Sequence, residues 1–442
     1  MAARGCPSNG TVVKRGNPGS ARRLRRRAAL IALSAAAIVA GAGTSASALI
    51  VHVHGAALSY APTRQSASRA AAQPVGSAAN TPVEYNGGPI MPSNTNYAFY
   101  WEPSGAPAYP AGYESGLNRY FQDLAADSGG QQNTDSVLAQ YKDLAGEFAS
   151  YNSHFGGALL DTDPCPANGC SAAPICLTDE QLRAEIKKYV EAHGLPADLQ
   201  HEYFMLTAPG VESCMEAAGH SCSAGTSHAT YCAYHGDIQS AKQVIVYAND
   251  PYVGGLNCDF GEEHPNGIAD ATIAGGLAHE HSESVTDPEL NAWFDSKGRE
   301  VADKCRTFKQ ATEYGEPLGK APDGSNYNQL INGDLYWYQQ EWSNEAGECT
   351  QRFAQPPTVK KSKPKSGPAA GGTVVTITGT NFTAPATVRF GATAATEATV
   401  NSATTITAVA PAGTAGTVDL TVTTSAGTSA INTKVHFKYK SR

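Results

Sequence analysis

Hydrophobic and polar positions follow two different patterns along the 442-residue chain, and the change comes near residue 356. Before it, apolar residues recur at helical spacing between 117 and 124 and again between 137 and 144, and the aromatic run at 96–101 is typical of a strand. After it, short Val/Thr/Ile segments alternate with period two between Gly, Pro and Asn turns. The patterns predict a mixed α+β body followed by a small all-β sandwich.

Two further helices are predicted in the body. Thr178 and Gln181 have the spacing of a capping box, and Gly194 stands where that helix should end. The second segment, 268–287, reads IADATIAGGLAHEHSESVTD and keeps helical spacing. It should end before Pro288, because the residue preceding a proline disfavours helical backbone.

The N-terminus has the features of an export signal. A cluster of arginines precedes an Ala-rich apolar stretch, and the small-x-small sequence Ala46-Ser-Ala48 follows. Residues 1–48 are therefore predicted to be a signal peptide, with a short membrane anchor as the alternative. Their removal would change the net charge from −8 to −16, because they hold eight Lys/Arg and no Asp/Glu. Such a polyanion is a poor partner for nucleic acid, so we expect a secreted, extracellular protein without an integral membrane segment after processing.

Cysteine usage supports an oxidising compartment. Nine cysteines remain after residue 48, all of them between 165 and 349. In an exported chain they should form disulfides, and the odd number predicts one free or intermolecular thiol.

Composition divides the rest of the chain. Residues 49–82 are Ala/Ser-rich without a sustained period, which predicts a linker or disordered arm. Order is expected over 83–355, and the basic, proline-bearing stretch 356–366 is predicted to be a second linker. The β-sandwich should occupy 367–440.

The sandwich region resembles a known module. The segment 366–382, SGPAAGGTVVTITGTNF, is similar to the IPT/TIG domain, which has an immunoglobulin-like fold, and so are 388–391 and 410–413. The resemblance implies a binding or spacer module, since no residue there has the character of a reactive centre.

The segment AHEHSESVTDP at 278–288 carries the chemistry of the body. His279 and Glu283 stand at i and i+4 of the predicted helix, so both side chains leave the same face. This is the spacing with which HExxH helices hold zinc, here with a carboxylate in place of the second imidazole. Glu280 would then act as general base. A polar helix whose acids and histidines are merely solvated is the alternative.

A third ligand is expected downstream. Glu300 and Asp303 lie 17 and 20 residues beyond Glu283. A strand through 300–303 would place them on opposite faces, so only one should bind. Asp303 is favoured because Cys305, two residues on, could be fixed by a disulfide, for example to Cys349. Zinc is the predicted ion, although a carboxylate-rich site also accepts Mn²⁺ or Ca²⁺.

Residues 278–305 look like the motif region of a bacterial secreted HExxE family related to the plant Exordium (phosphate-induced) proteins. The segments 83–90, 232–235 and 340–344 carry the same resemblance. It implies a zincin-like body, a mixed sheet with an active-site helix, and a place at or near a cell wall or polysaccharide surface.

The predicted function is therefore a secreted zinc peptidase-like protein that hydrolyses extracellular protein or peptide substrates with a metal-activated water. Tyr336, Tyr338 and His235 are candidate oxyanion donors, although each has an ordinary structural alternative. His281, two residues beyond His279, is predicted to be structural, since i,i+2 residues do not share a helix face. The alternative function is a non-catalytic extracellular binding protein with a structural metal site.

Overall fold

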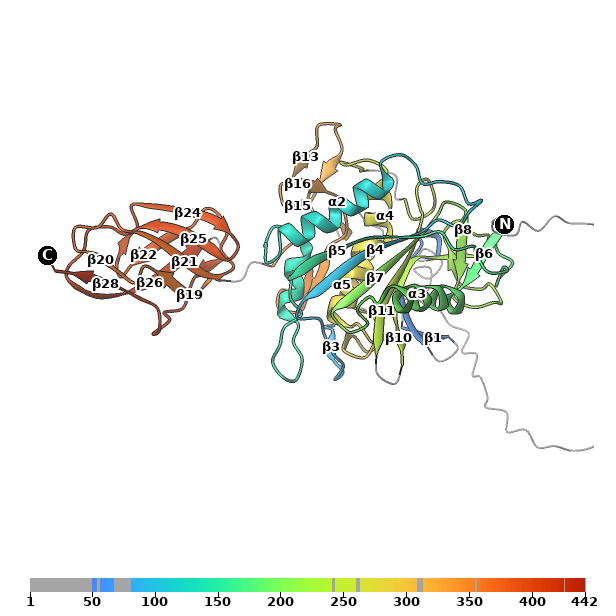
Figure 1. The fold of residues 1–442 in the computed structure, drawn as a ribbon, viewed down its shortest axis with the longest axis horizontal. Coiled ribbons are helices and arrows are strands. Elements are labelled where there is room, and N and C mark those ends of the chain that lie inside the picture. The colour runs from blue at the N-terminus through green and yellow to red at the C-terminus, as the bar shows by residue number, and fades with distance from the viewer. Residues whose placement is uncertain are drawn as a thin grey trace, which may run out of the picture.

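The computed structural model describes residues 50–53, 56–66, 81–240, 243–259, 263–307, 313–353, 356–424 and 426–441. It shows a larger body and, after residue 356, a separate β-sandwich (Figure 1). The predicted signal peptide 1–48 lies outside the described residues. Within those residues, no helix combines the length and the apolar character needed to cross a bilayer.

The body is built on a mixed sheet of ten strands. Five of them run in the order β5-β4-β7-β11-β10, in which β10 is antiparallel to β11 and the other neighbours are parallel. β9, β8 and β6 continue beyond β10, and β2 also pairs with β10. The strands of this sheet are β1 (Val51–Val53), β2 (Ala56–Pro62), β4 (Asn94–Trp101), β5 (Ser153–Asp161), β6 (Ile175–Thr178), β7 (His201–Thr207), β8 (Val211–Cys214), β9 (Cys222–Ser223), β10 (Ala229–Gln239) and β11 (Val244–Pro251).

Helices cover both faces of this sheet, because successive side chains of a strand point to opposite faces. On one face Phe99 of β4 packs on Tyr189 of α3 (Asp179–His193). On the other face Phe204 of β7 packs on Phe121 of α2 (Tyr113–Ala126) and lies near His281 of α5 (Ala278–Thr286). The predicted capping box of α3 is confirmed, and Gly194 ends that helix with a φ of 62°.

Short elements complete the body. A segment predicted as helical around 137–144 is instead a 3-10 helix that ends at Gln140, and Leu144 beyond it is exposed. The remaining elements are η2 (Thr134–Gln140), α4 (Ala269–Thr272), η3 (Ile273–Leu277), η4 (Asp303–Cys305), β3 (Glu84–Tyr85), β12 (Trp293–Phe294), β13 (Gly319–Lys320), β14 (Asn326–Tyr327), β15 (Gln329–Ile331), β16 (Asp334–Tyr336), β17 (Glu341–Ser343) and β18 (Glu348–Thr350).

The C-terminal part is an all-β sandwich, as predicted. A four-stranded sheet in the order β19-β21-β25-β24 faces a six-stranded one that contains β20, β28, β26, β22, β23 and β27. Buried and exposed residues alternate along β21 and β22, and the buried ones share one apolar core. Its strands are β19 (Thr358–Lys363), β20 (Ser366–Pro368), β21 (Val374–Thr380), β22 (Thr387–Phe390), β23 (Thr393–Ala394), β24 (Glu397–Ser402), β25 (Thr405–Val409), β26 (Gly416–Thr424), β27 (Gly427–Thr428) and β28 (His436–Lys440).

Two linker predictions are wrong in part. Residues 358–363, placed in a linker, form β19 and pair with β21. Residues 56–62, placed in a disordered arm, form β2 and pair with β10. In both segments the ordering comes from a partner strand that lies far along the chain, which local composition does not reveal.

Four disulfides join described cysteines: Cys170–Cys176, Cys214–Cys222, Cys232–Cys258 and Cys305–Cys349. The suggested pairing of Cys305 with Cys349 is confirmed. Cys165 is also disulfide-bonded, so the expected free thiol is not found among the described cysteines. These disulfides are consistent with an extracellular protein.

Candidate metal centre

Glycines bring the helix that carries the centre close to the sheet. α4, η3 and α5 form one continuous rod, and η3 is a short π-helical segment that contains Gly275 and Gly276. A Cβ atom on Gly276 would lie 2.4 Å from the Cβ of Ala233 on β10, so a larger residue would push the helix away. The π-helical turn and these glycines place all nine residues of α5 in buried positions.

Three predicted ligands converge at the N-terminal end of α5. His279 Nε2 lies 3.2 Å from Glu283 Oε1 and 3.3 Å from Asp303 Oδ1. Asp303 begins η4, and its backbone N–H donates to Glu283 Oε1 at 3.0 Å. One helical turn and one distant loop therefore bring an imidazole and two carboxylates around a single point.

The hydrogen bonds of Gln339 determine which nitrogen of His279 carries the proton. Gln339 Oε1 accepts from Arg306, and its Nε2 donates to the carbonyl oxygen of Ala302. Because Oε1 can only accept, His279 Nδ1, at 3.0 Å from it, must be the donor. In the neutral ring Nε2 then presents a lone pair to the two carboxylates, the orientation typical of a metal-bound histidine.

The residues present fit a divalent metal ion. Four-coordinate zinc with bonds of about 2.0–2.2 Å places its ligand atoms about 3.3–3.6 Å apart. The observed separations of 3.2 and 3.3 Å lie at the short end of this range. Neither His279 Nε2 nor Asp303 Oδ1 has a hydrogen-bond partner in the described part of the chain. Both side chains are at most 1% exposed. Buried polar atoms without partners are costly, and a cation would satisfy both.

Electrostatics point the same way. Burial alone would lower the pKa of His279, but Glu283 and Asp303 outweigh it and raise that pKa well above its ordinary value. Burial first, and Glu283 second, raise the pKa of Asp303 to about 7. The ligands thus compete for protons when no cation is present, and a divalent ion would replace those protons.

Glu280, the predicted general base, lies beside the ligands but is fully engaged. Its Oε1 accepts from the backbone N–H of Ala61 on β2 at 3.0 Å, and its Oε2 lies 3.0 Å from Nδ1 of His235 on β10. His235 was a candidate oxyanion donor. The structure places it against Glu280, with Glu283 at 3.8 Å, and its pKa is raised to about 9 because these acids outweigh the effect of burial.

Glu300 and Asp303 do not lie on a strand, so that prediction is wrong. Residues 301 and 302 form a turn, and Asp303 starts a 3-10 helix. Asp303 reaches His279, whereas Glu300 Oε1 lies 3.9 Å from Nε2 of His235. Glu300 is fully buried, and burial first and Glu283 second raise its pKa well above the usual range.

The two tyrosines point to other acids. The hydroxyl of Tyr336 donates to Asp123 at 2.6 Å, and that of Tyr338 donates to Asp135 at 3.2 Å. Asp135 also contacts Nδ1 of His281 at 3.2 Å. The structural role predicted for His281 is thus supported, and both tyrosines have the ordinary role that was their alternative.

Sequence reasoning missed the residues that complete and cover the centre. Gln339 orients His279, and Ser59 and Ala61 of β2 reach Glu283 and Glu280. No local pattern identifies them, because each contact joins residues at least 60 positions apart in the chain.

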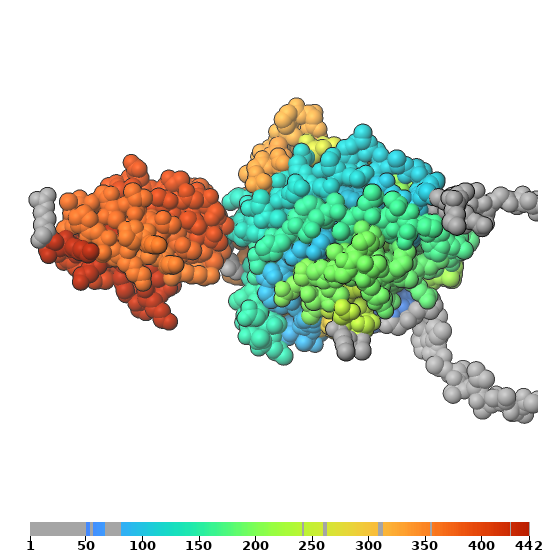
Figure 2. Space-filling view, in the orientation of Figure 1, coloured from blue at the N-terminus to red at the C-terminus, as the bar shows by residue number. Residues whose placement is uncertain are grey.

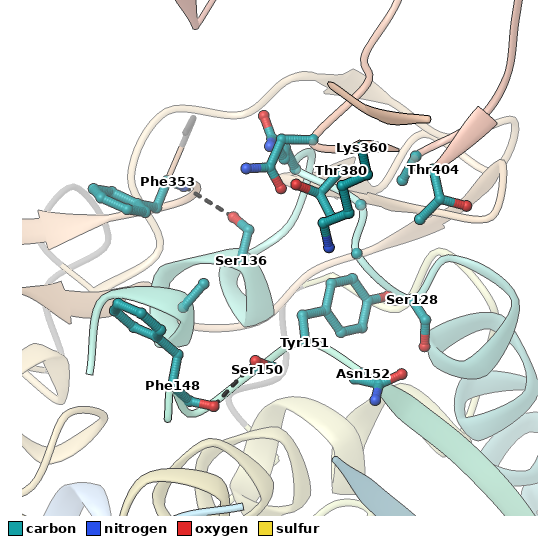
Figure 3. Close-up of a pocket in the computed structure, with 16 residues that line it drawn as sticks. Ser128, Ser136, Phe148, Ser150, Tyr151, Asn152, Phe353, Lys360, Thr380 and Thr404 are labelled. Atoms are coloured by element: carbon teal, nitrogen blue, oxygen red, sulfur yellow. Dashed lines mark hydrogen bonds between the residues drawn. The ribbon is translucent and has the colours of Figure 1, made fainter. Parts of the chain in front are cut away.

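A second concave region lies between the body and the sandwich. This junction cavity has a volume of about 440 Å³. The body contributes Phe148, Tyr151 and Asn152 to its lining, and the sandwich contributes Lys360 and Thr404 (Figure 3). Figure 2 shows the two parts meeting on one side of the body. The lining of the junction cavity combines aromatic rings with amide and hydroxyl groups and with the ammonium group of Lys360, polar groups that can orient a bound ligand.

Comparison with known proteins identifies the sandwich. Residues 357–439 match the IPT/TIG domain family. This part of the chain is an IPT/TIG domain. The confirmed resemblance begins at β19, which explains why residues 358–363 are a strand and not a linker. No curated protein matched the chain.

Solved structures overlap with small parts of the chain. SGBP-B from a complex xyloglucan utilization locus in Bacteroides uniformis is 28% identical over 18% of this chain and 23% of its own, with a TM-score of 0.16. The Plexin A4 extracellular region is 21% identical over 25% and 11%, with a TM-score of 0.19. Gamma-CGTase from alkalophilic Bacillus clarkii is 25% identical over 26% and 17%, with a TM-score of 0.17. The chain spans less than a quarter of each of these structures.

Proposed function

We propose that this chain is an exported, extracellular metal-binding protein. Its body holds one zinc ion with His279, Glu283 and Asp303, and its IPT/TIG domain binds a further extracellular macromolecule. The observation that carries the proposal is the pair of buried, unpartnered ligand atoms, His279 Nε2 and Asp303 Oδ1, facing each other at 3.3 Å. Mn²⁺ and Ca²⁺ are the competing ions, because two of the three ligands are carboxylates.

A structural or storage role for the ion agrees best with the closed centre. His279, Glu280 and Glu283 are each at most 1% exposed, so no substrate reaches them in this arrangement. Three protein ligands would leave the fourth position of a tetrahedral zinc ion to water, as in catalytic sites, so the burial of the centre and not the ligand count favours the structural role. The IPT/TIG domain gives such a protein a binding surface without requiring chemistry in the body.

The test is metal content. Protein purified without chelators should carry one zinc per chain, measured by inductively coupled plasma mass spectrometry. Asp303→Asn, which keeps the side-chain shape and removes the charge, should lose most of the zinc. The matched control is His281→Gln, a buried histidine on the same helix that should keep it. Equal zinc in wild type and Asp303→Asn would contradict the proposed site.

A metallopeptidase is the second candidate function. Glu280 adjoins the ligand His279 on the same helix, and the mixed sheet with a buried metal-binding helix supports the zincin-like, HExxE-bearing body that the Exordium-related resemblance implies. Zinc, when bound, would supply Lewis acidity, and Glu280 would hold the transferred proton on a carboxylate oxygen. Both oxygens of Glu280 now have partners, so this function requires the contact with Ala61 to break.

Peptidase assays on casein and on a library of peptides separate the two candidates. Under the enzyme hypothesis, Glu280→Gln keeps its zinc and loses turnover. Zinc-loaded protein that shows no turnover, even when the contact between Glu280 and Ala61 has been broken, supports the hypothesis of a non-catalytic binding protein.

The partner of the IPT/TIG domain is proposed to be a polysaccharide of a cell wall or surface. The amide, hydroxyl and aromatic groups of the junction cavity are suited to sugar hydroxyls and ring faces. Pull-down on insoluble wall polysaccharide tests this proposal. Phe148→Ala, which removes a 44% exposed ring from the cavity, should weaken retention, and unchanged retention would exclude the cavity as the binding site.

A further inference from the structure

One short strand forms the cover of the metal centre. We call β2, Ala56–Pro62, the N-terminal strap. It pairs antiparallel with β10, and its Ser59 stands opposite His235, the residue that touches Glu280. The strap thus crosses β10 at the position where that strand meets the centre.

Two backbone and side-chain groups of the strap reach into the centre. The N–H of Ala61 donates to Glu280 Oε1 at 3.0 Å, and the hydroxyl of Ser59 donates to Glu283 Oε2 at 3.4 Å. Both contacts are fully buried. The strap therefore holds one carboxylate oxygen of Glu280 and one of Glu283, and it covers the centre on that side.

The strap is attached in a way that allows it to leave as a unit. The strap also pairs with β1, which has no other partner among the described strands, so the two would separate together as a hairpin while the order of the other strands stays unchanged. Its main apolar anchor is Leu58, which is fully buried and packs over Gly236 of β10. A Cβ atom on Gly236 would lie 2.9 Å from Leu58 Cδ2, so that glycine makes room for the anchor.

We propose that the N-terminal strap is a displaceable closure of the metal centre. In the closed form it locks the ion in and occupies Glu280, and its displacement opens the ion and Glu280 to outside ligands. This inference rests on the proposed metal site. The inference adds that the rate at which a chelator or a substrate reaches the ion is limited by the release of β2.

The experiment compares the rates at which a chelator removes zinc. Zinc-loaded full-length protein is mixed with excess 4-(2-pyridylazo)resorcinol, and the coloured zinc complex is followed over time. Leu58→Ala weakens the anchor and should raise the removal rate about tenfold or more. The matched control is Leu124→Ala, an equally buried leucine of the same core that belongs to α2 and not to the strap, and its rate should stay within about twofold of wild type.

Each outcome decides between the claims. Protein that carries no zinc contradicts the proposed function. The second possibility is that the protein carries zinc but both variants release it at the wild-type rate, or both release it faster by the same factor. Either result contradicts the role of the strap as a closure and does not affect the proposed metal site. If Leu58→Ala does not fold, Gly236→Ala serves instead, because its added Cβ pushes against Leu58 while the side chain of the strap stays intact.

Hydrogen exchange of the wild type gives an independent readout. The amide of Ala61 should exchange at the rate at which zinc becomes accessible, and much faster than amides of the central strand β7. Exchange of Ala61 as slow as that of β7 would show that the strap opens only when the body unfolds, which contradicts the proposal.

Discussion

The body and the IPT/TIG domain bury different kinds of side chain, and the difference indicates which of the two parts can bind a metal ion. The domain core is apolar and comes from alternating strand positions such as Val375 and Ile377. The body also buries carboxylates and histidines, among them Glu202, Asp250 and Glu283 at 0–1% exposure. An apolar core needs no partner beyond itself, whereas buried acids need protons, hydrogen bonds or a cation. The body is therefore the part of the chain in which a bound cation would add stability.

The largest expected change in stability comes from a substitution in the apolar core of the IPT/TIG domain. Ile377→Ala removes a fully buried side chain there and should destabilise the domain by about 2–5 kcal/mol. Calorimetry should show its transition shifted down while zinc content is unchanged. A simultaneous loss of zinc would show that the two parts depend on each other.

Zinc should stabilise the body alone. A ligand at 100 times its dissociation constant stabilises the folded state by about 2.7 kcal/mol. All four tryptophans lie between residues 101 and 342, so tryptophan fluorescence reports unfolding of the body. We expect zinc to raise that midpoint and to leave the IPT/TIG transition where it was. An equal shift of both unfolding transitions would contradict the claim that zinc stabilises the body alone.

The orientation of His279 should matter somewhat less. Gln339→Met removes the acceptor for Nδ1 at nearly constant volume, and loss of such an outer partner typically weakens metal binding about 10–100-fold. Gln329→Met is the matched control, since Gln329 is equally buried and contacts Thr134 instead. Competition titration with a chelator measures both, and equal affinities would argue that Gln339 does not hold the ring.

The smallest expected effect is the dependence of the stability of the metal-free body on pH. Burial raises the pKa of Glu202 to about 7, and burial with the nearby Asp135 raises that of Asp127 to about 7. The folded body then binds more protons than the unfolded chain between about pH 4 and pH 7. Stability of the metal-free body should therefore fall as pH rises through this window, by a few degrees in the fluorescence midpoint. Glu202→Gln should flatten the dependence, and a midpoint that rises from pH 5 to pH 8 would contradict it.

The features that could be predicted from the sequence are those that depend on local patterns of residues. Alternation predicted the strands of the sandwich, and helical spacing up to Pro288 placed His279 and Glu283 one turn apart on α5. The sequence also favoured Asp303 over Glu300 because of the nearby Cys305, whose disulfide with Cys349 is present, whereas the strand considered for 300–303 is a turn followed by a 3-10 helix.

What the sequence could not supply depends on contacts between distant segments. The strap pairs with a strand about 170 residues later, and Gln339 meets a histidine 60 positions earlier. Neither contact leaves a periodic signature, because pairing depends on which edge of the sheet stays open once the body has folded. Tyr336 and Tyr338 illustrate the same limit, since only the fold shows that their hydroxyls meet Asp123 and Asp135.

X-ray absorption at the zinc edge of protein purified without chelators tests the central claim most directly. We predict one zinc per chain, bound by a single imidazole and by carboxylate oxygens at about 2.0–2.2 Å. Protein that is free of zinc and takes up none when it is supplied, or a spectrum dominated by sulfur ligands, would contradict the metal centre of His279, Glu283 and Asp303.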